Sequence, residues 1–420
     1  MRLSNLRGEL AAFVTFSCVI AAGAAVFGQS KTGLPSSRDL SRYGLTRAWW
    51  NQATMDPSRD QIRHLTGDED NIYVQSRSGI VTAFDAESGR RLWSLLVGSD
   101  NQQALPASSN SGILLIAVGL KVHAVNKFTG EVLWELELPH HPSTAPAMDD
   151  DRVYLGMVDG SSFAYDLRKI RDLWEENRLP RWSNYAFVWR YKAPQQISSP
   201  PVPDGRSVTF ASMNGSVYSV GASERKLFYQ FETAGRTRIV TPLGRGRDSI
   251  FVTSEDARMF CLNKENGVRR WAFTAGVPIR QQPRVVEGSV YVCPQDDGMY
   301  CLNVSSGLTK WHQARASAFL ASTTDYLIAS DSLDNVLLLS HDDGAIVGVL
   351  PLRGLNVRLH NERTDRCYLA SDDGLIVCLR QKGQEFPLYH MFPDRRPLMP
   401  EFAPEEAEPP APEADPTEPN

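Results

Sequence analysis

The sequence predicts an all-β fold, an eight-bladed β-propeller whose blades are four-stranded antiparallel sheets. An eleven-residue pattern, Ala-x-(Asp/Asn)-x-x-(Ser/Thr)-Gly-x-x-x-Trp, occurs at Ala83–Trp93 and again at Ala124–Trp134. Its Trp column recurs roughly every forty residues, with one longer gap. Each interval holds short β-rich runs broken by Asp-Gly or Asn-Gly turns, as in "VYLGMVDGSSFAY". Four short strands in each unit of this length are typical of a propeller blade.

The pattern has three columns: an Asp or Asn, then a Gly, then a Trp, evenly spaced. The Asp or Asn side chain can accept hydrogen bonds from backbone N–H groups nearby, and the Gly can adopt a left-handed conformation. The Trp is a large apolar anchor at the start of the next strand. We therefore expect a structural motif that consists of Asp85, Gly89, Trp93, Asn126, Gly130, Trp134, Asn263, Gly267, Trp271, Asn303, Gly307 and Trp311.

Degenerate copies extend the Trp column through the chain. Trp189 is delayed within its unit, whereas Tyr229 and Gly348 replace the tryptophan in theirs. Eight units are expected between residues 64 and 390. Extrapolated towards the N-terminus, the column reaches Trp50. We therefore expect the strand at Trp50 to complete the sheet begun by the last unit, because an unpaired edge invites aggregation.

The two ends of the chain differ in composition from the repeats. Residues 1–28 place two arginines before an uncharged apolar stretch, which is typical of a signal peptide or, alternatively, of an uncleaved membrane anchor. Residues 29–44 are expected to form a linker and residues 45–390 the propeller. Residues 391–420 are expected to be a disordered, acidic, Pro-rich tail. The body of the protein is thus expected to be exported.

Few features of the sequence point to chemistry. The formal net charge is −5, and its acidic excess lies in residues 401–420, so no basic surplus indicates nucleic-acid binding. Neither a Gly-rich phosphate loop nor the H-E-x-x-H and G-x-S-x-G motifs occur. The pair His140-His141 is interpreted as part of a polar loop. No catalytic, cofactor-binding or metal-binding residue is therefore predicted.

The cysteines do not form a disulfide framework. There are six, with no adjacent pair and no C-x-x-C. If "CYLASDDGLIVC" is a hairpin that turns at Asp372-Asp373, then Cys367 and Cys378 face each other across its strands. We expect two small buried thiols without a bond, and a disulfide between them is the alternative.

One unit is longer than the ring requires. The segment Asp166–Trp189 contains about fifteen residues more than its counterparts. Ile170, Leu173 and Trp174 have the i, i+3, i+4 spacing of one helical face, and Pro180 would end that helix. The insertion either packs back onto the propeller edge or binds a partner, since loops on rigid scaffolds often do so. The candidate partner-binding residues are Leu173, Trp174, Trp182 and Tyr185.

The repeated motif resembles that of the pyrroloquinoline quinone (PQQ)-type eight-bladed propellers, over roughly residues 45–390. The chain has no Trp-Asp or Gly-His dipeptide of the WD40 type and no Gly-Gly doublet of the kelch type. The resemblance implies that the Trp motif docks neighbouring blades together. Quinoprotein dehydrogenases of this type bind PQQ and calcium, and carry adjacent cysteines and acidic calcium ligands that have no match in this chain.

The sequence is also similar in size, export signal and blade number to the outer-membrane assembly factor B propellers. This resemblance implies a non-enzymatic scaffold in the periplasm or anchored facing it, without a cofactor. Its partners would be envelope proteins, including an outer-membrane β-barrel assembly machine. The segment before Cys18 departs from a lipobox, which leaves attachment to the membrane through the N-terminal segment open. A PQQ-dependent dehydrogenase and a propeller that binds a small ligand or polysaccharide remain alternatives.

Overall fold

The computed structural model describes residues 34–179 and 183–391. The expected signal peptide or anchor, the tail beyond residue 391 and Trp182 lie outside the described residues. The expected linker is helical in part, because α1 (Ser37–Ser41) falls within it and buries Leu40. Within the described ranges, no helix has the length and apolar character needed to cross a membrane.

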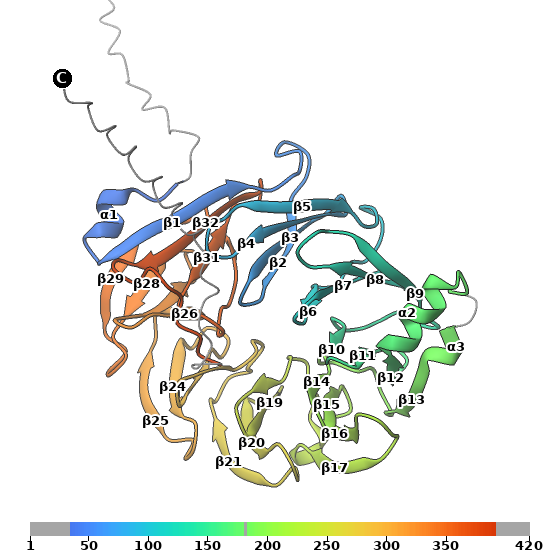
Figure 1. The fold of residues 1–420 in the computed structure, drawn as a ribbon. Helices are drawn as coiled ribbons and strands as arrows, with labels where there is room; N and C mark the ends of the chain where they lie inside the picture. Colours follow the sequence, from blue (N-terminus) through green and yellow to red (C-terminus); the bar gives the residue numbers. More distant parts are fainter. Residues whose placement is uncertain (1–33, 180–182, 392–420) are drawn as a thin grey trace, which may run out of the picture. The chain divides into compact units, whose positions relative to one another are not determined.

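The described residues form eight four-stranded antiparallel sheets arranged in a ring, which confirms the predicted eight-bladed propeller (Figure 1). We number the blades 1 to 8 in chain order and give their strands from the innermost to the outermost. Blade 1 has β2 (Ile62–Gly67), β3 (Asn71–Ser76), β4 (Ile80–Asp85) and β5 (Arg91–Leu96); blade 2 has β6 (Ser108–Ser109), β7 (Ile113–Val118), β8 (Lys121–Asn126) and β9 (Val132–Glu137). Blade 3 has β10 (Ala147–Met148), β11 (Arg152–Gly156), β12 (Ser161–Asp166) and β13 (Phe187–Lys192); blade 4 has β14 (Val202–Asp204), β15 (Ser207–Ser212), β16 (Ser216–Gly221) and β17 (Leu227–Glu232).

The second half of the ring repeats this arrangement. Blade 5 has β18 (Gly244–Arg245), β19 (Ser249–Ser254), β20 (Arg258–Asn263) and β21 (Arg269–Thr274); blade 6 has β22 (Arg284–Val286), β23 (Ser289–Val292), β24 (Met299–Asn303) and β25 (Thr309–Gln313). Blade 7 has β26 (Ala316–Ser322), β27 (Leu327–Asp331), β28 (Val336–Leu339) and β29 (Ile346–Leu350); blade 8 has β30 (Val357–Arg358), β31 (Cys367–Ala370), β32 (Leu375–Gln381) and β1 (Leu45–Gln52). The remaining elements are α2 (Leu167–Glu175), α3 (Ser183–Ala186) and the short 3₁₀ helix η1 (Ala234–Arg236).

The core lies between the blades. The middle strands are buried on both faces, as in β3 "NIYVQS" and β15 "SVTFAS", where every residue is buried. These strands are rich in small, β-branched and aromatic residues, which suits a sheet that packs against a neighbour on each side. The outermost strands bury only one row of side chains, so the rim of the ring is polar with single apolar positions.

The N-terminal strand closes the ring, as expected. β1 pairs antiparallel with β32, from Leu45 opposite Gln381 to Gln52 opposite Leu375, with a bulge between Arg47 and Trp49. The predicted position of the anchoring tryptophan in this strand was wrong by one residue. Trp49 is buried, whereas Trp50 is 52% exposed. Successive residues of a strand point to opposite faces, so the bulge and a one-residue shift decide which indole packs inward.

The two cysteines proposed to face each other do not. In the β31–β32 hairpin, Cys367 lies opposite Leu379 and Cys378 lies opposite Tyr368. The pairing is one residue out of the assumed register, so the two side chains are not directly opposite each other. All five cysteines of the described residues are free and buried, and burial raises the pKa of the Cys367 thiol to about 12.

Candidate functional sites

The expected structural motif joins each blade to the next. The Trp93 indole Nε1 donates to the Lys127 carbonyl oxygen of blade 2 at 3.0 Å, and its ring covers Gly130, where an added β-carbon would lie 2.6 Å away. Trp271 contacts Gly307 and the Val304 carbonyl in the same way. The glycine of each motif therefore receives the tryptophan of the preceding blade. Trp311 continues the series on Gly344 and donates to the His341 carbonyl at 2.9 Å.

The Asp or Asn column shapes the turn that carries this glycine. Asp85 Oδ1 accepts a hydrogen bond from the Ser88 backbone N–H at 2.7 Å, and Asn126 Oδ1 accepts from the Phe128 N–H at 3.0 Å. The equivalent bonds in blades 5 and 6 have Asn263 and Asn303 as acceptors, both at 2.9 Å. These polar side chains are thus used within their own turns.

In some blades, other residues make the contact between an aromatic ring and the next blade. Trp189 docks on blade 4 and donates to the Ala222 carbonyl at 3.0 Å, while the Tyr229 ring covers Gly267 of blade 5. On blade 7, Gly348 leaves room for the ring of Tyr43, which comes from the segment before β1. Trp134 belongs to a core cluster with Leu167 and Ile170 of α2.

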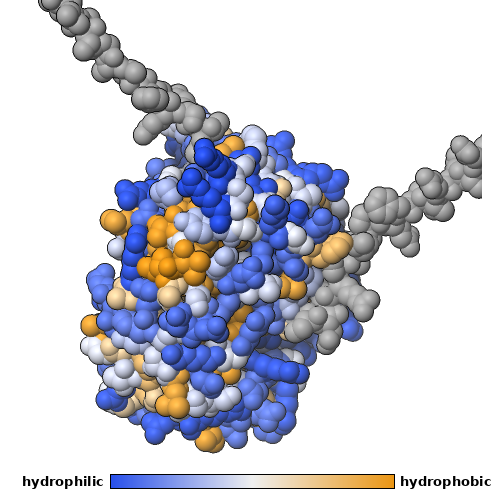
Figure 2. All heavy atoms as spheres, turned by 90° about the vertical axis from the view of Figure 1, so that its left-hand side faces the viewer, coloured by the Kyte–Doolittle hydropathy of each residue, from blue (hydrophilic) through white to orange (hydrophobic). Residues whose placement is uncertain are grey.

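The flank of blade 7 carries an exposed apolar patch. Figure 2 shows apolar residues gathered on the side of the molecule that includes α1 and β29. On β29, Ile346 and Val347 are 36% and 49% exposed, and Gly348 between Val347 and Val349 is covered by Tyr43. Part of this apolar surface is therefore occupied by the N-terminal segment of the propeller itself.

The blade-3 insertion is a helix fixed to the ring by one face. Asp166 caps α2, and its side chain accepts a hydrogen bond from the Lys169 N–H at 3.0 Å. Leu167, Ile170 and Leu173 are buried in the cluster that also contains strands of blades 2 and 3. The spacing of Ile170, Leu173 and Trp174 thus corresponds to a helix as expected, although α2 ends at Glu175, before Pro180.

Two of the candidate partner-binding residues reach the surface of the described residues. Leu173 is only 7% exposed, since it packs with Ile170 against the blades. Trp174 is partly buried at the edge of the same cluster, and Tyr185 is 60% exposed on α3. The Arg178 guanidinium lies 6.0 Å from the centre of the Tyr185 ring. We call Trp174, Arg178 and Tyr185 the blade-3 surface; the position of Trp182 is not described.

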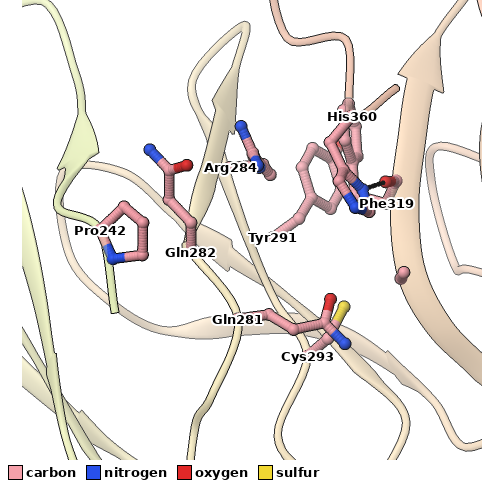
Figure 3. A pocket seen from close by; sticks show the side chains of 9 residues that line it. Pro242, Gln281, Gln282, Arg284, Tyr291, Cys293, Phe319 and His360 are labelled. Carbon is pink, nitrogen blue, oxygen red and sulfur yellow. Dashed lines mark hydrogen bonds between the residues drawn. The ribbon is translucent and has the colours of Figure 1, made fainter. Parts of the chain in front are cut away.

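A second candidate site lies in the channel, where the innermost strands meet. One pocket of about 430 Å³ is lined by residues of seven blades, and another of about 290 Å³ lies beside blades 5 to 8. The smaller pocket is called the channel pocket here. The two share Pro242, Gln282, Arg284 and His360, so they are continuous. Figure 3 shows Gln282 and Pro242 on one side of the channel pocket and Tyr291 and His360 on the other.

The charges in the channel are paired. Arg363 Nη1 donates to both carboxylate oxygens of Glu69 at 3.0 Å. The Arg358 guanidinium lies 3.5 Å from the Asp334 carboxylate. Arg284 lies 3.7 Å from Glu362, which is too long for a hydrogen bond. Each channel arginine therefore has an acidic neighbour, and the arginine of the channel pocket is the most loosely held of the three.

His360 supplies the imidazole of the channel pocket, which Tyr291 and Cys293 also line. Its Nδ1 is 2.5 Å from the Phe319 carbonyl oxygen, a contact drawn in Figure 3. Burial, with a smaller effect of the nearby Arg284 charge, lowers the pKa of His360 to about 4. The imidazole is therefore neutral near pH 7, with its proton on Nδ1.

Sequence reasoning missed this channel pocket. Its lining comes from segments that are spread from Pro242 to His360, and the stretch "RQQPRVV" that supplies Gln282 and Arg284 matches no known motif. The blade count could have located the innermost strands, and the position of these residues on those strands is the one signal that would have identified them.

The residues present do not fit a PQQ and calcium site. The chain has no adjacent cysteines, and the described cysteines lie on β20, β24, β31, β32 and directly after β23. Within the described ranges, no group of three or more His, Cys, Asp or Glu side chains is arranged to hold a metal ion.

Comparison with known proteins agrees with this architecture. The crystal structure of BamB from Moraxella catarrhalis superposes with a TM-score of 0.62 at 16% identity, over 81% of this chain and 98% of that one. The computationally designed Ika8 protein superposes with a TM-score of 0.61 at 12% identity, over 76% and 96% of the two chains. At such identities these superpositions show the fold alone.

Relatives are also found by sequence. Outer membrane protein assembly factor BamB of Shewanella oneidensis is 19% identical over 213 residues, which are 50% of this chain and 52% of the relative. BamB of Moranella endobia is 22% identical over 227 residues, or 52% and 56% of the two chains. The chain thus matches about half the length of these curated relatives.

The family model described as outer membrane protein assembly factor BamB covers far more of the chain. It matches residues 47–111, 77–184 and 214–366, which together comprise well over half of the sequence and include part of every blade. The chain therefore belongs to the outer membrane protein assembly factor BamB family.

Proposed function

We propose that the protein is an exported, non-enzymatic scaffold of the cell envelope, which binds partner proteins during assembly of outer-membrane proteins. Its family and the named function of its relatives support this role. The observation that carries the proposal is the blade-3 insertion, a helical addition to an otherwise repeated blade. Membership of the propeller family alone would not support a specific function, because one fold serves many functions.

The geometry of α2 suits recognition of a protein. Its buried face fixes the helix on the ring, so little conformational freedom is lost when a partner binds. The blade-3 surface presents Trp174, Arg178 and Tyr185, and these residue types are enriched among those that dominate binding energy. Charged side chains around them form solvent-exposed ion pairs, Arg171 with Glu175 at 4.0 Å and Arg178 with Glu176 at 2.9 Å, and such surface pairs contribute little to stability. A partner can thus contact the aromatic groups at the cost of exposed ion pairs alone.

The partner we propose is a component of an outer-membrane β-barrel assembly machine. The full chain, purified through a C-terminal affinity tag from detergent-solubilised envelopes, is expected to co-purify that machine's central barrel subunit. Tyr185→Ala and Trp174→Ala are expected to abolish this capture. Because Tyr185 is exposed, its variant should melt like the parent, and Trp174→Ala should melt only slightly lower.

Two controls make the experiment decisive. Trp50→Ala removes an exposed tryptophan from β1 of blade 8, outside the blade-3 surface, and should leave capture unchanged. Leu173→Ala should lower the melting temperature markedly, since removing a buried leucine side chain costs about 2–5 kcal/mol. If Trp174→Ala behaves like Leu173→Ala and Tyr185→Ala still captures the partner, the insertion is part of the propeller edge and the proposal fails.

A further inference from the structure

The channel pocket has polar groups whose hydrogen-bonding roles are fixed by their neighbours. Gln282 Nε2 donates to the Leu243 carbonyl at 2.9 Å, and Gln281 Nε2 donates to the Ser317 carbonyl at the same distance. Because a carbonyl can only accept, each amide must place its nitrogen there and keep its oxygen for other contacts. Neither amide oxygen has a hydrogen-bond partner among the described residues.

His360 is fixed in the same manner. The Phe319 carbonyl requires a proton on Nδ1, so the neutral ring presents the lone pair of Nε2 as an acceptor. No described residue donates to this nitrogen. Figure 3 shows His360 and Gln282 on opposite sides of the pocket, with Arg284 between them at one end.

Arg284 is the matching donor. Its guanidinium carries five N–H groups, and within the described residues its one ionic contact is Glu362 at 3.7 Å. Arg358 and Arg363 differ, since they are engaged by backbone carbonyls or by carboxylates at hydrogen-bond distance. The pocket thus combines the Arg284 guanidinium, which can donate several hydrogen bonds, with three acceptor atoms. These acceptors are Gln281 Oε1, Gln282 Oε1 and His360 Nε2.

The charge of this region selects against ions. Arg284 is balanced by Glu362, Arg358 by Asp334 and Arg363 by Glu69. A small anion would gain Arg284 but would face the acceptor atoms of Gln282 and His360, and a small cation would face Arg284. A neutral molecule meets neither penalty.

We infer that the channel pocket binds a neutral, hydroxyl-rich molecule about the size of a monosaccharide. Each hydroxyl is both a donor and an acceptor, so neighbouring hydroxyls can accept from Arg284 and donate to Gln282 and His360. The volume of about 290 Å³ is at the lower end of the range for small-molecule sites. Pro242 and the buried, mutually stacked Tyr291 and Phe319 rings supply apolar walls. This binding is independent of the blade-3 surface, which lies on the outside of the ring.

The test is saturation-transfer NMR on the full chain with glucose, galactose and N-acetylglucosamine as probes, and with sodium acetate and ammonium chloride as ionic probes. At least one sugar is expected to give saturable transfer, and the two ions none. Gln282→Met and Arg284→Met are each expected to weaken that binding by about tenfold or more. The matched controls Gln230→Met and Arg236→Met, on the exposed outside of blade 4 and in η1, should bind as the parent does.

Each other outcome overturns the inference. If no sugar binds, the channel holds only water; if acetate binds and the sugars do not, Arg284 forms an anion site. Sugar binding that survives both Gln282→Met and Arg284→Met places the ligand elsewhere. Circular dichroism and the melting temperature of each variant separate lost binding from lost folding, and Arg284→Lys keeps the charge should Arg284→Met not fold. Capture of the assembly partner by Gln282→Met should equal that of the parent, so the two proposals can fail separately.

Discussion

The indole ring of Trp49 lies directly against Gly89, so close that a β-carbon on this glycine would overlap it. Trp49 belongs to β1 of blade 8, and Gly89 belongs to the turn between β4 and β5 of blade 1. The indole Nε1 also donates to the Ala86 carbonyl at 2.8 Å, and the Asn51 side chain donates to the Gly89 carbonyl at 2.8 Å. These contacts join the last blade to the first.

Gly89→Ala is therefore expected to destabilise the protein by about 2–4 kcal/mol, measured by denaturant unfolding. Two effects add: the residue has a φ of 68°, which an alanine adopts at a cost, and the new methyl group displaces Trp49. Gly235→Ala is the matched control, because Gly235 has the same φ of 68° but no atom within 4 Å of an added β-carbon. Equal losses in the two variants would show that the Trp49 contact contributes nothing.

A chain without residues 40–55 should be much less stable than the parent. The deletion removes β1, exposes the edge of β32 and leaves Gly89 and Gly348 without their aromatic covers. Thermal unfolding followed by circular dichroism measures the effect, with removal of residues 401–420 as the control that should leave the midpoint unchanged. A deletion variant that melts like the parent would show that the ring does not need this strand.

PQQ with Ca²⁺ is expected to leave the melting temperature of the protein unchanged. The chain lacks adjacent cysteines, and the described residues offer no cluster of metal ligands. A ligand present at 100 times its dissociation constant would add about 2.7 kcal/mol, a change that moves the midpoint by several degrees. A clear upward shift would support a quinoprotein dehydrogenase in place of a scaffold.

Acidification should destabilise the fold through His360. Its pKa is about 4 in the folded protein and 6.5 in its unperturbed state. Above pH 6.5 the ring is neutral in both states, so it has no effect. As the pH falls from 6.5 towards 4, the unfolded chain takes up a proton that the folded chain does not, and the free energy of unfolding falls by at most about 3 kcal/mol.

His360→Gln should remove this part of the pH dependence, because a glutamine amide can still donate to the Phe319 carbonyl without titrating. Unfolding in urea at several pH values between 4 and 7 measures the slope. The exposed His141 provides the control, and His141→Gln should reproduce the parent profile. An unchanged slope in His360→Gln would assign the acid sensitivity to other groups, among them His64 and His123, whose pKa values burial also lowers.

The eightfold fold was predictable because four blades repeat the same local chemistry at the same spacing and the others keep that spacing with different residues. An Asp or Asn that accepts from its own turn, as Asp85 does from Ser88, and a glycine with a left-handed backbone can be recognised from spacing alone. The helix of the insertion was predictable for the same reason, because the spacing of Ile170 and Leu173 and the cap Asp166 belong to a single segment of the chain.

Features that depend on register were not predictable to the residue. Trp50 fitted the average repeat spacing, yet the bulge after Arg47 turns Trp49 inward. The expected facing of Cys367 and Cys378 was wrong for the same reason, because a shift of one residue changes which side chains face each other, whereas both thiols are free and buried. The channel pocket combines segments from four blades, and no single stretch of sequence carries a signal for it.

The pairing of β1 with β32 also has a consequence for how the chain reaches its final form. Leu45 and Gln381 become neighbours although they are separated by nearly the whole propeller sequence, and such distant contacts are slow to form. A chain synthesised from its N-terminus must therefore keep β1 unpaired until β32 exists. A product that ends before β32 would leave β1 without its partner strand, so blade 8 would remain unfinished with an open strand edge.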